Sequence, residues 1–398
     1  MIFRRYGTFT GGIDLPDEKR PTLGLDIAVV DRPGRLAVPL APCGGAPAAA
    51  TVALGDRVRA GDRIARAVDP GGLDIFAPLD GKVAGITSVA AARWAGFDRC
   101  PAVELTDLSD PAGIVPPRSG GADAKPAGTS PASQPARSDA WRTAPLGELL
   151  ARLTEGQIAT HGRAASPLAR RVDKARDARC RWAILNVMEH EPYVSSDHRL
   201  LAEYGPEIME GLAILAWVIG ARQTILAADR RRTGHYHSCG AAAERLGITR
   251  VALPHKYPMG AETILAKVLT RRETPPGTST IAVGAAIFDA PTCLAVQQWI
   301  VHRRRVLGRV VTLAGPRTAK PGNFWTPLGM SCAELAGSTG TNEAAEGPVI
   351  VHGGPMAGTL CDPAAVVTQA TGALLSLDPQ TMPLPSPCLR CGWCTDHC

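Results

Sequence analysis

Four cysteines near the carboxyl end of the chain have the spacing of an iron–sulfur ligand set. Cys388, Cys391, Cys394 and Cys398 form a C-x2-C-x2-C-x3-C sequence. A short looping backbone with this spacing can place four thiolates around a single [4Fe–4S] cluster. The alternative is a zinc site, but zinc sites usually combine two widely separated pairs of ligands. The sequence therefore predicts one iron–sulfur cluster held by these four thiolates.

This run differs from the runs of two-cluster ferredoxins. In those proteins the fourth cysteine binds the other cluster and is followed by proline, whereas here no second run occurs and Cys398 is the last residue. Two interpretations stay open: one cluster takes all four sulfurs, or the relatives of this chain are longer. Trp393 lies between the ligands, and an aromatic ring in this position favours burial against another subunit.

A second group of polar residues follows a strand-like run. The apolar segment Trp182–Val187 is followed by an acidic stretch that contains Glu189, His190 and Glu191. Ligands of open parallel sheets bind outside the carboxyl ends of the strands, so a cofactor or substrate could lie here. The alternative is a solvated loop that leads into a helix capped by a residue of the segment 195–197. The spacing alone does not separate the two.

The remaining cysteines and histidines carry weaker indications. His235, His237 and Cys239 form an H-x-H-x-C triplet, but a metal site needs a fourth ligand that the sequence does not identify. Eleven cysteines is an odd number, which does not fit a disulfide framework. The cysteines that stand singly are expected to be packing residues or exposed thiols: Cys43, Cys100, Cys180, Cys239, Cys293, Cys332 and Cys361.

The elements that must position these residues indicate a multidomain α/β protein. Short apolar runs cut by Gly, Pro and Asp predict a small all-β module before residue 110. Residues 111–140 are rich in Pro, Ala, Gly and Ser and predict a flexible linker. Helix-length segments and strand-like runs then alternate, which is typical of a parallel sheet. The predicted parts are 1–110, 111–140, 141–314, a small α+β unit at 315–380, and an iron–sulfur segment at 381–398.

Within the α/β part we expect particular strands and helices. The predicted strands are 182–187, 224–228, 250–253, 281–287 and 309–313. The predicted helices are 198–219, 241–246, 261–271 and 292–305.

Composition excludes several classes of protein. The chain has 398 residues, of which 45% are apolar and 20% charged, as in an ordinary globular protein. The longest strongly apolar run, residues 212–219, is far shorter than the about 20 residues that a membrane span needs. The net charge of +6 is spread along the chain, which does not favour nucleic acid. Since no export signal is visible, we expect a cytoplasmic protein whose membrane contact runs through partners.

The β module resembles the half-barrel of biotinyl and lipoyl carriers. The resemblance rests on residues 55–62 (GDRVRAGD) and 77–83 (APLDGKV). A carrier needs a lysine at its hairpin tip, where this chain has Asp69-Pro70-Gly71-Gly72. Lys82 follows a turn and is expected to be a solvated strand residue. The module is therefore predicted to be structural.

Five short motifs together resemble the C subunit of the Rnf (Rsx) electron-transport complex. They are residues 8–14 (TFTGGID), 186–193 (NVMEHEPY), 257–262 (YPMGAE), 320–323 (KPGN) and 353–358 (GGPMAG). That protein is similar to the flavin- and NADH-binding subunit of respiratory complex I with a half-barrel in front. The resemblance implies a Rossmann-like FMN-type domain, a small β-grasp-like unit and a membrane-associated subunit on the cytoplasmic face. In the family, such a site splits a hydride into single electrons for iron–sulfur partners.

The resemblance also assigns residues to the site. It implies that Asn186, Glu189 and Glu191 face the flavin and nicotinamide. Tyr257, Gly260 and Glu262 would form the neighbouring loop. Asp289 stands where relatives usually have asparagine, so an acceptor-only carboxylate replaces an amide beside an anionic phosphate.

The glycine-rich loop of the family is the main departure. Aligned on Pro167, this chain has Thr160, Gly162, Arg163 and Ala165 at the four glycine places. Ser166 stands for phenylalanine and Arg171 for lysine. Side chains at places where backbone amides approach a phosphate add bulk and strain. We therefore predict weak or absent NADH binding, with FMN a candidate cofactor beside the cluster.

Two functions follow from these expectations. The first is an electron-transfer subunit that passes electrons between NADH or flavin and iron–sulfur partners, among them other redox subunits or a ferredoxin. The alternative is a docking subunit that keeps the fold and the cluster but has lost nucleotide binding. Flavin content of the purified protein separates the two.

Overall fold

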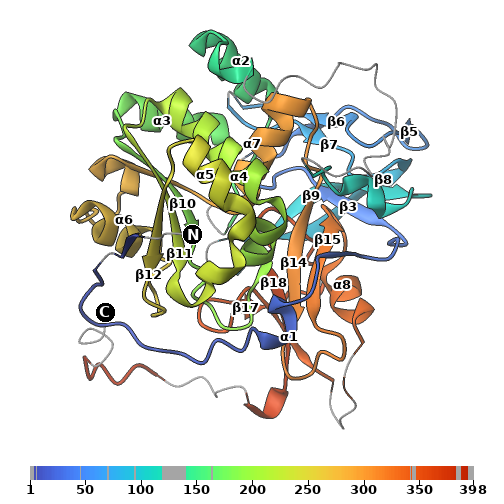
Figure 1. Cartoon of the computed structure of the whole chain (residues 1–398). Helices are drawn as coiled ribbons and strands as arrows, with labels where there is room; N and C mark the ends of the chain where they lie inside the picture. Colours follow the sequence, from blue (N-terminus) through green and yellow to red (C-terminus); the bar gives the residue numbers. More distant parts are fainter. Residues whose placement is uncertain are drawn as a thin grey trace.

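The chain folds into three parts that pack side by side. Figure 1 shows a layered α/β part on the left, a β module at the upper right and a second sheet at the lower right. The computed structural model describes residues 4–5, 7–44, 46–69, 71–93, 96–118, 140–162, 165–340, 342, 347–381 and 387–392.

The predicted all-β module is present in residues 36–106. Its long antiparallel hairpin pairs β8 (Gly81–Arg93) with β9 (Gly96–Thr106). Alternate apolar side chains turn inward, so that Leu36, Ile64 and Leu105 are fully buried. The other strands are β3 (Leu36–Pro39), β4 (Ala49–Ala50), β5 (Arg57–Val58), β6 (Arg63–Arg66) and β7 (Ile75–Phe76).

The α/β part is built on a five-stranded parallel sheet in the order β1-β12-β11-β10-β13. Its strands are β1 (Arg4–Arg5), β10 (Trp182–Val187), β11 (Gln223–Asp229), β12 (Thr249–Leu253) and β13 (Ala285–Phe288). The strand predicted at 281–287 is shorter than expected, because its first residues form the 3-10 turn η5 (Thr280–Val283).

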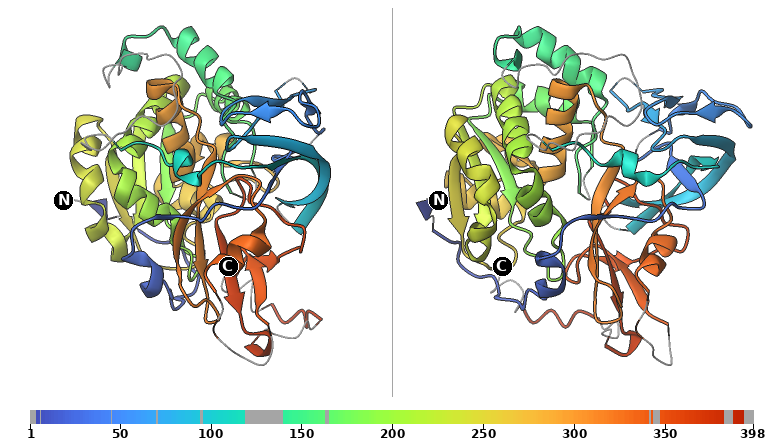
Figure 2. Two further views of the ribbon diagram at one scale, coloured as in Figure 1. Left: turned by 90° about the vertical axis from the view of Figure 1, so that its right-hand side faces the viewer. Right: turned by 45° about the vertical axis from the view of Figure 1, so that its right-hand side comes forward.

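Helices cover both faces of this sheet (Figure 2). Side chains alternate along each strand: Trp182 and Ile184 of β10 pack with α6 on one face, while Leu185 faces the helices of the other. The helices of the α/β part are α2 (Leu146–Gly156), α3 (Leu168–Asp177), α4 (Ser196–Ile219), α5 (Gly240–Arg245), α6 (Glu262–Thr270) and α7 (Ala290–His302). Within the described ranges, none of the helices is long and apolar enough to cross a membrane.

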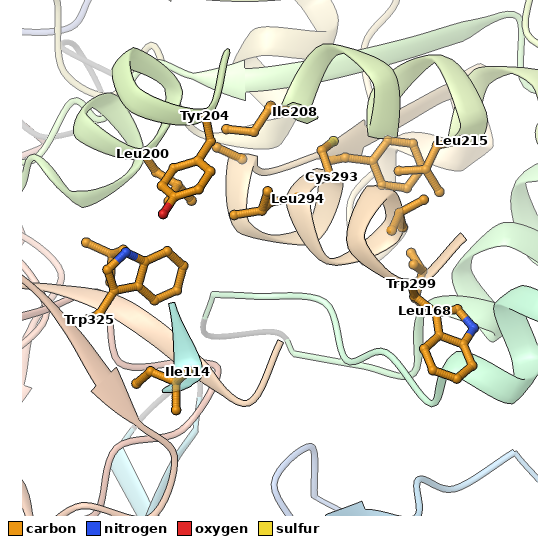
Figure 3. Close-up of a cluster of buried hydrophobic side chains, with 14 of the residues drawn as sticks. Ile114, Leu168, Leu200, Tyr204, Ile208, Leu215, Cys293, Leu294, Trp299 and Trp325 are labelled. Atoms are coloured by element: carbon orange, nitrogen blue, oxygen red, sulfur yellow. The ribbon is translucent and has the colours of Figure 1, made fainter. Parts of the chain in front are cut away.

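Helices α4 and α7 form the centre of the core (Figure 3). They approach closely because Gly211 has no side chain: a Cβ there would lie 1.8 Å from the carbonyl oxygen of Cys293. At one end of this core the ring of Tyr204 meets the ring of Trp325 edge-on, with centroids 5.9 Å apart. Trp325 belongs to the second sheet, so one core joins the two parts.

The second sheet has six strands in the order β17-β16-β18-β14-β15-β2. β14 pairs in parallel with β18 at its centre and antiparallel with β15. Its elements are β2 (Ala28–Val29), β14 (Gly308–Ala314), β15 (Gly322–Pro327), α8 (Cys332–Ser338), β16 (Val349–His352), β17 (Thr359–Leu360) and β18 (Ala373–Leu377). The strand predicted at 309–313 is therefore β14 and lies in this sheet, not in the parallel one as expected. Every residue of β14 is buried, and a strand buried on both faces does not reveal from its sequence which sheet contains it.

Two predicted boundaries also differ from the structure. The segment before residue 36 does not belong to the β module, because β1 pairs with β12 and β2 pairs with β15. The start of the predicted linker is packed: Ile114 is buried in the 3-10 turn η1 (Pro111–Ile114), and the Tyr204 hydroxyl donates to the Pro116 carbonyl. Residues 119–139 of that linker lie outside the described residues.

Candidate functional site

The candidate site lies where the strand order of the parallel sheet reverses. After β10 the chain adds β11 and β12 on one side and then returns to place β13 on the other. Helix α4 begins shortly after β10, and α7 begins directly after β13. Both helix amino ends therefore face the carboxyl edge between these two strands. In open α/β sheets this is the position where ligands bind.

The amino end of α4 holds the carboxylate of Glu189. Its Oε1 accepts from the Asp197 amide and its Oε2 from the His198 amide, both at 2.8 Å. Burial raises the pKa of the Glu189 carboxyl, while Lys19 and these amides act in the opposite direction. The Lys19 ammonium also donates to the Glu189 carbonyl oxygen. Glu189 is thus used to cap the helix.

The amino end of α7 holds the carboxylate of Asp289. Its Oδ1 accepts from the Thr292 amide at 2.8 Å, and the His161 Nδ1 lies 3.8 Å from the same oxygen. Burial lowers the pKa of His161 to about 4, so the ring is neutral at pH 7. Helix amino ends are common anion sites. Here both of them face carboxylates of the chain itself.

Two further buried charges complete the site. Burial raises the pKa of Asp197 well above its usual range, and Glu189 and Asp289 add to this effect. Burial lowers the pKa of the Arg309 guanidinium, which donates to the Gln369 carbonyl oxygen. Sequence reasoning did not single out Arg309 or Lys19. The one sequence signal for Arg309 is its position at the start of a strand-like run, which indicates that its side chain could be buried beside acidic groups.

The loop at residues 160–168 closes on itself. The Thr160 amide donates to the Ser166 carbonyl at 2.8 Å, and the Ser166 amide donates to the Thr160 hydroxyl at 2.9 Å. The other described amides of the loop are also paired. The His161 amide donates to Thr292 Oγ1, and the Gly162 amide donates to the Gln369 carbonyl. The Ala165 amide donates to the Gly162 carbonyl, and the Leu168 amide donates to the Ile158 carbonyl. Each described amide that can donate therefore has an acceptor in the chain, while Arg163 and Ala164 lie outside the described residues.

Arg171, at the place of the family's lysine, is held by protein groups. Its Nη2 lies 3.1 Å from both carboxylate oxygens of Glu262 and 2.7 Å from the Ile287 carbonyl oxygen. Glu262 is the first residue of α6, and Ile287 belongs to β13. This contact connects the two elements and engages the Glu262 carboxylate.

Asn186 joins the end of β10 to the neighbouring loop. Its Nδ2 donates to the Gly260 carbonyl at 2.9 Å, and its Oδ1 accepts from the Met188 amide at 3.2 Å. Gly260 cannot carry a side chain here, because a Cβ would lie 2.1 Å from the Nδ1 of His190. The His190 ring meets the Tyr257 ring edge-on at 4.9 Å. Asn186, His190, Tyr257 and Gly260 thus lie together at this edge of the sheet.

The remaining motifs reach the same edge. Glu191 Oε2 accepts from the Met356 amide at 2.9 Å, which connects it to the 353–358 motif. Asn323 of the 320–323 motif donates to the Ser195 hydroxyl at 3.0 Å, just before α4. The 8–14 motif lies on the amino-terminal segment, dark blue in Figure 1, where Ile13 and Tyr257 exchange backbone hydrogen bonds.

Two of the predicted cluster ligands are described. Cys388 and Cys391 are exposed, and the Arg390 amide donates to the Cys388 sulfur at 3.4 Å. Cys394 and Cys398 lie outside the described residues. Among the residues that are described, no group of three His, Cys, Asp or Glu side chains is arranged to hold a metal ion.

The two described side chains of the H-x-H-x-C triplet, those of His237 and Cys239, do not form a metal site. The Cys239 thiol is buried, donates to the Tyr236 carbonyl at 3.0 Å, and has a pKa raised by burial to about 11. His237 is exposed, and the side chain of His235 is outside the described part.

Family models match two parts of the chain. Residues 7–106 match the RnfC barrel sandwich hybrid domain, and residues 153–298 match the Nuo51 FMN-binding domain. They agree with the β module and the α/β part.

Curated relatives match almost the whole chain. It is 27% identical over 399 residues to the C subunit of the ion-translocating oxidoreductase complex of Edwardsiella ictaluri (strain 93-146), covering 99% of this chain and 47% of that protein. The corresponding protein of Klebsiella pneumoniae (strain 342) is 27% identical over 398 residues, covering 98% and 49%. The chain spans about half the length of these relatives. The resemblance to the RnfC family is confirmed.

A solved structure shares the fold. A chain of an NAD+-reducing [NiFe]-hydrogenase in the air-oxidised state matches 60% of this chain and 50% of that one, with a TM-score of 0.50 and 21% identity.

Proposed function

We propose that this chain, which resembles the RnfC proteins of ion-translocating oxidoreductase complexes, is an electron-transfer subunit of such a complex. One observation carries the proposal. Five motifs far apart in the sequence meet at the carboxyl edge of one sheet through the Ile13–Tyr257, Asn186–Gly260, Glu191–Met356 and Ser195–Asn323 contacts. The protein would lie on the cytoplasmic side of the membrane, held by partner redox subunits or a ferredoxin, and would bind no nucleic acid.

The terminal cysteines fit a [4Fe–4S] cluster. Thiolate sulfurs of such clusters accept backbone hydrogen bonds that tune the reduction potential, and the Arg390 amide already donates to Cys388. Both described thiols are exposed, where a cluster could bind without rearranging the core. We propose that Cys388, Cys391, Cys394 and Cys398 hold one cluster. When bound, it supplies one-electron transfer.

The residues at the switch point do not fit a nucleotide phosphate in the manner of the family. The matched domain type supports flavin and iron–sulfur as the class of cofactor. However, the described amides of the 160–168 loop are paired, and Glu189 and Asp289 cap the two helix ends. A phosphate would have to displace a protein hydrogen bond and approach the half-buried carboxylates of Glu189 and Asp289. We therefore propose that Gly162, Asn186, Glu189, Glu191, Tyr257, Gly260, Glu262 and Asp289 hold the fold of this edge, and that NADH binds weakly.

The paired loop favours a second candidate, a docking subunit that keeps the fold and the cluster. Its contribution would be to hold redox partners together, not to exchange electrons with a nucleotide. The two candidates differ in whether the cluster is needed once the complex has assembled.

We also propose a division of the chain. The order β15-β14-β18-β16 with α8 supports a β-grasp-like unit, which begins with β14 and not at residue 315. The barrel module would then comprise residues 36–106, the α/β part would end before β14, and residues 381–398 would form the iron–sulfur segment.

One experiment tests the function. The chain is purified anaerobically, its iron, sulfide and flavin are quantified, and it is combined with its membrane partners with and without the substitution Cys391→Ala. Electron transfer predicts about four iron atoms per chain and a complex that assembles with Cys391→Ala but has lost electron flow. A complex that keeps its full activity with this variant would leave only the docking function.

A further inference from the structure

Five arginines line one depression at the amino edge of the parallel sheet. They come from three segments that are far apart in the sequence: the stretch from the end of α3 to β10, the turn between α4 and β11, and the residues after α6. The five are Arg176, Arg179, Arg181, Arg222 and Arg272. This arginine depression is therefore at the opposite edge of the sheet from the candidate site.

Backbone hydrogen bonds and one aromatic ring hold these segments together. The Arg222 amide donates to the Arg181 carbonyl at 2.9 Å, and the Arg181 amide donates to the Gly284 carbonyl at 2.9 Å. The guanidiniums of Arg181 and Arg272 each lie 5.3 Å from the centre of the Trp182 ring. A guanidinium that lies over a ring still presents N–H donors at its edge to an oxygen ligand. The fold therefore fixes the place of these charges and leaves donors available.

Carboxylates do not balance the positive charge of the arginine depression. Within the described part of the chain, no Asp or Glu side chain forms an ion pair with any of the five guanidiniums. Residues 170–181 contain six Arg or Lys but only two Asp, and four of the five arginines are exposed, with Arg176 half-buried. The carboxyl ends of α3, α4 and α6 lie at the same edge, and their dipoles offset part of the repulsion between the arginines. The remaining positive potential attracts an anionic partner.

An exposed tryptophan indicates which kind of anionic partner fits. Trp217 lies in the last turn of α4, close in the chain to Arg222, and its side chain is 53% exposed. Tryptophan near basic residues is typical of surfaces at the membrane interface, where the ring lies among lipid headgroups. A redox partner is expected instead at the carboxyl edge of the sheet, one length of the six-residue strand β10, about 20 Å, from this depression. These observations favour a lipid surface over an acidic protein.

We propose that the arginine depression and Trp217 bind the headgroups of anionic phospholipids at the cytoplasmic face of the membrane. The inference rests on the proposed function for the location of the chain at that face, and it adds a direct lipid contact to the contacts with partner subunits. Guanidiniums bind phosphate oxygens through two parallel N–H donors, so neighbouring arginines can share the phosphates of several headgroups. Binding in this way turns the carboxyl edge of the parallel sheet away from the lipid surface.

The test measures sedimentation of the full, cluster-loaded chain with lipid vesicles. We expect binding to phosphatidylcholine vesicles that contain phosphatidylglycerol, no binding to vesicles of phosphatidylcholine alone, and weaker binding as the salt concentration rises. Electron flow is not part of this measurement, so a failure to bind vesicles leaves the proposed function standing, and a chain without redox activity can still bind them. If soluble glycerol phosphate at the same phosphate concentration displaces the chain from the vesicles, the site takes a free phosphate and the lipid proposal is wrong.

A pair of substitutions and a matched control locate the binding surface. Arg179→Gln with Arg222→Gln should weaken vesicle binding about 30-fold, because each basic residue near an anionic membrane contributes about fivefold. The control is Arg57→Gln with Arg59→Gln, the same charge change at exposed positions of the barrel module, which lies on the opposite side of the molecule from α3 (Figure 1). Both variants should keep the native melting temperature, and the control should bind vesicles like the native chain.

Three results would overturn the proposal. The first is that the native chain does not bind the anionic vesicles, and the second is that both pairs of substitutions weaken binding equally. The third is that the Arg179→Gln, Arg222→Gln variant binds vesicles normally but no longer associates with its partner subunits in detergent solution, because the depression would then bind an acidic protein.

Discussion

Arg171 donates to both carboxylate oxygens of Glu262 at 3.1 Å, and its guanidinium also donates to the Ile287 carbonyl. The pair fastens the first turn of α6 to the carboxyl end of β13, and Arg171 stands at the place of the lysine in the family's glycine-rich motif. All three contacts are made by the Nη2 nitrogen of Arg171, so one end of the guanidinium serves both the Glu262 carboxylate and the Ile287 carbonyl.

Removing either partner should destabilise the chain by different amounts. Glu262→Gln keeps one hydrogen bond on a half-exposed side chain, so we expect a loss of about 0.5–1 kcal/mol in the free energy of unfolding. Arg171→Ala also leaves the Ile287 carbonyl without its donor and should cost about 1–3 kcal/mol. Urea unfolding followed by circular dichroism measures both. Equal losses for the two variants would contradict this account.

Gly211→Ala should force α4 and α7 apart. The added Cβ would lie 1.8 Å from the Cys293 carbonyl oxygen, which is backbone and cannot turn away. Overpacking of this kind typically costs about 1–3 kcal/mol, and more where the backbone must shift. The matched control is Gly147→Ala in α2, where a Cβ meets open space and alanine favours the helix. Thermal unfolding should show a lower midpoint for the first variant and an equal or higher one for the second.

Acid should destabilise the fold through buried histidines. Burial lowers the pKa of His190 to about 4 from its ordinary 6.5, so the folded protein keeps the ring neutral. Below about pH 6.5 the unfolded chain binds a proton that the folded chain does not, so the free energy of unfolding falls as the pH drops towards 4. The full effect is about 3 kcal/mol for this ring.

Unfolding titrations between pH 7 and 4 test this linkage. His190→Gln should flatten the pH dependence, because the substituted side chain cannot titrate. His237→Gln, at an exposed position, should leave the slope unchanged. An identical slope in the native chain and both variants would show that other groups govern acid unfolding.

Patterns in the sequence predicted the elements better than their assembly. The strand β10 has the predicted bounds, because its apolar run ends abruptly in polar residues. β14 has the same kind of apolar run, and only pairing with β15 and β18 decides its sheet. The amino-terminal segment could not be placed, because two-residue strands such as β1 depend on tertiary contacts. Which sheet such a strand joins depends on the segments that lie next to it in the fold, and the hydrophobic periodicity of the sequence does not contain that information.

The position of the candidate site was predictable from the sequence, but the hydrogen-bond partners of its side chains were not. The motifs indicated that Asn186, Glu191 and Gly260 lie near one another, and the hydrogen bonds of Asn186 and Glu191 place them at one edge. The use of Glu189 as a helix cap depends on where α4 begins. The sequence offered Ser195, Ser196 or Asp197 as caps, since local capping residues are the common solution. Capping of α4 by Glu189, a residue of the preceding loop, depends on how that loop folds back onto the helix, and local sequence patterns do not predict this.

Cys391→Ala should remove the cluster and leave the rest folded. Its thiol is exposed, and the described segment 387–392 contributes none of the buried core residues. We expect loss of the visible thiolate-to-iron absorbance and of about four iron atoms per chain, with an unchanged melting temperature of the upstream parts. Cys180→Ala, at a single buried cysteine, is the control that keeps the iron. About eight iron atoms in the native chain, or stoichiometric zinc, would refute a single cluster.

Glycines restored to the 160–168 loop should increase nucleotide affinity. Thr160→Gly removes the hydroxyl that accepts from the Ser166 amide, so one donor becomes free for a phosphate. Side chains at glycine places can cost about 1–3 kcal/mol each, and three of them could offset the about 8 kcal/mol of a micromolar complex. Calorimetric titration with NADH and FMN separately should therefore show weak binding to the native chain and tighter binding to the triple variant Thr160→Gly, Arg163→Gly, Ala165→Gly.

A control substitution separates the loop from general loosening of the fold. Thr278→Gly changes an exposed turn remote in sequence from the loop and should leave both affinities as they are in the native chain. Micromolar NADH binding by the native chain would overturn the argument, because the paired amides would then not prevent binding. If the triple variant still binds weakly, we infer that the carboxylates of Glu189 and Asp289 at the two helix ends repel the phosphate. In that case Asp289→Asn, which introduces the residue usual in the family, should increase the affinity for the nucleotide.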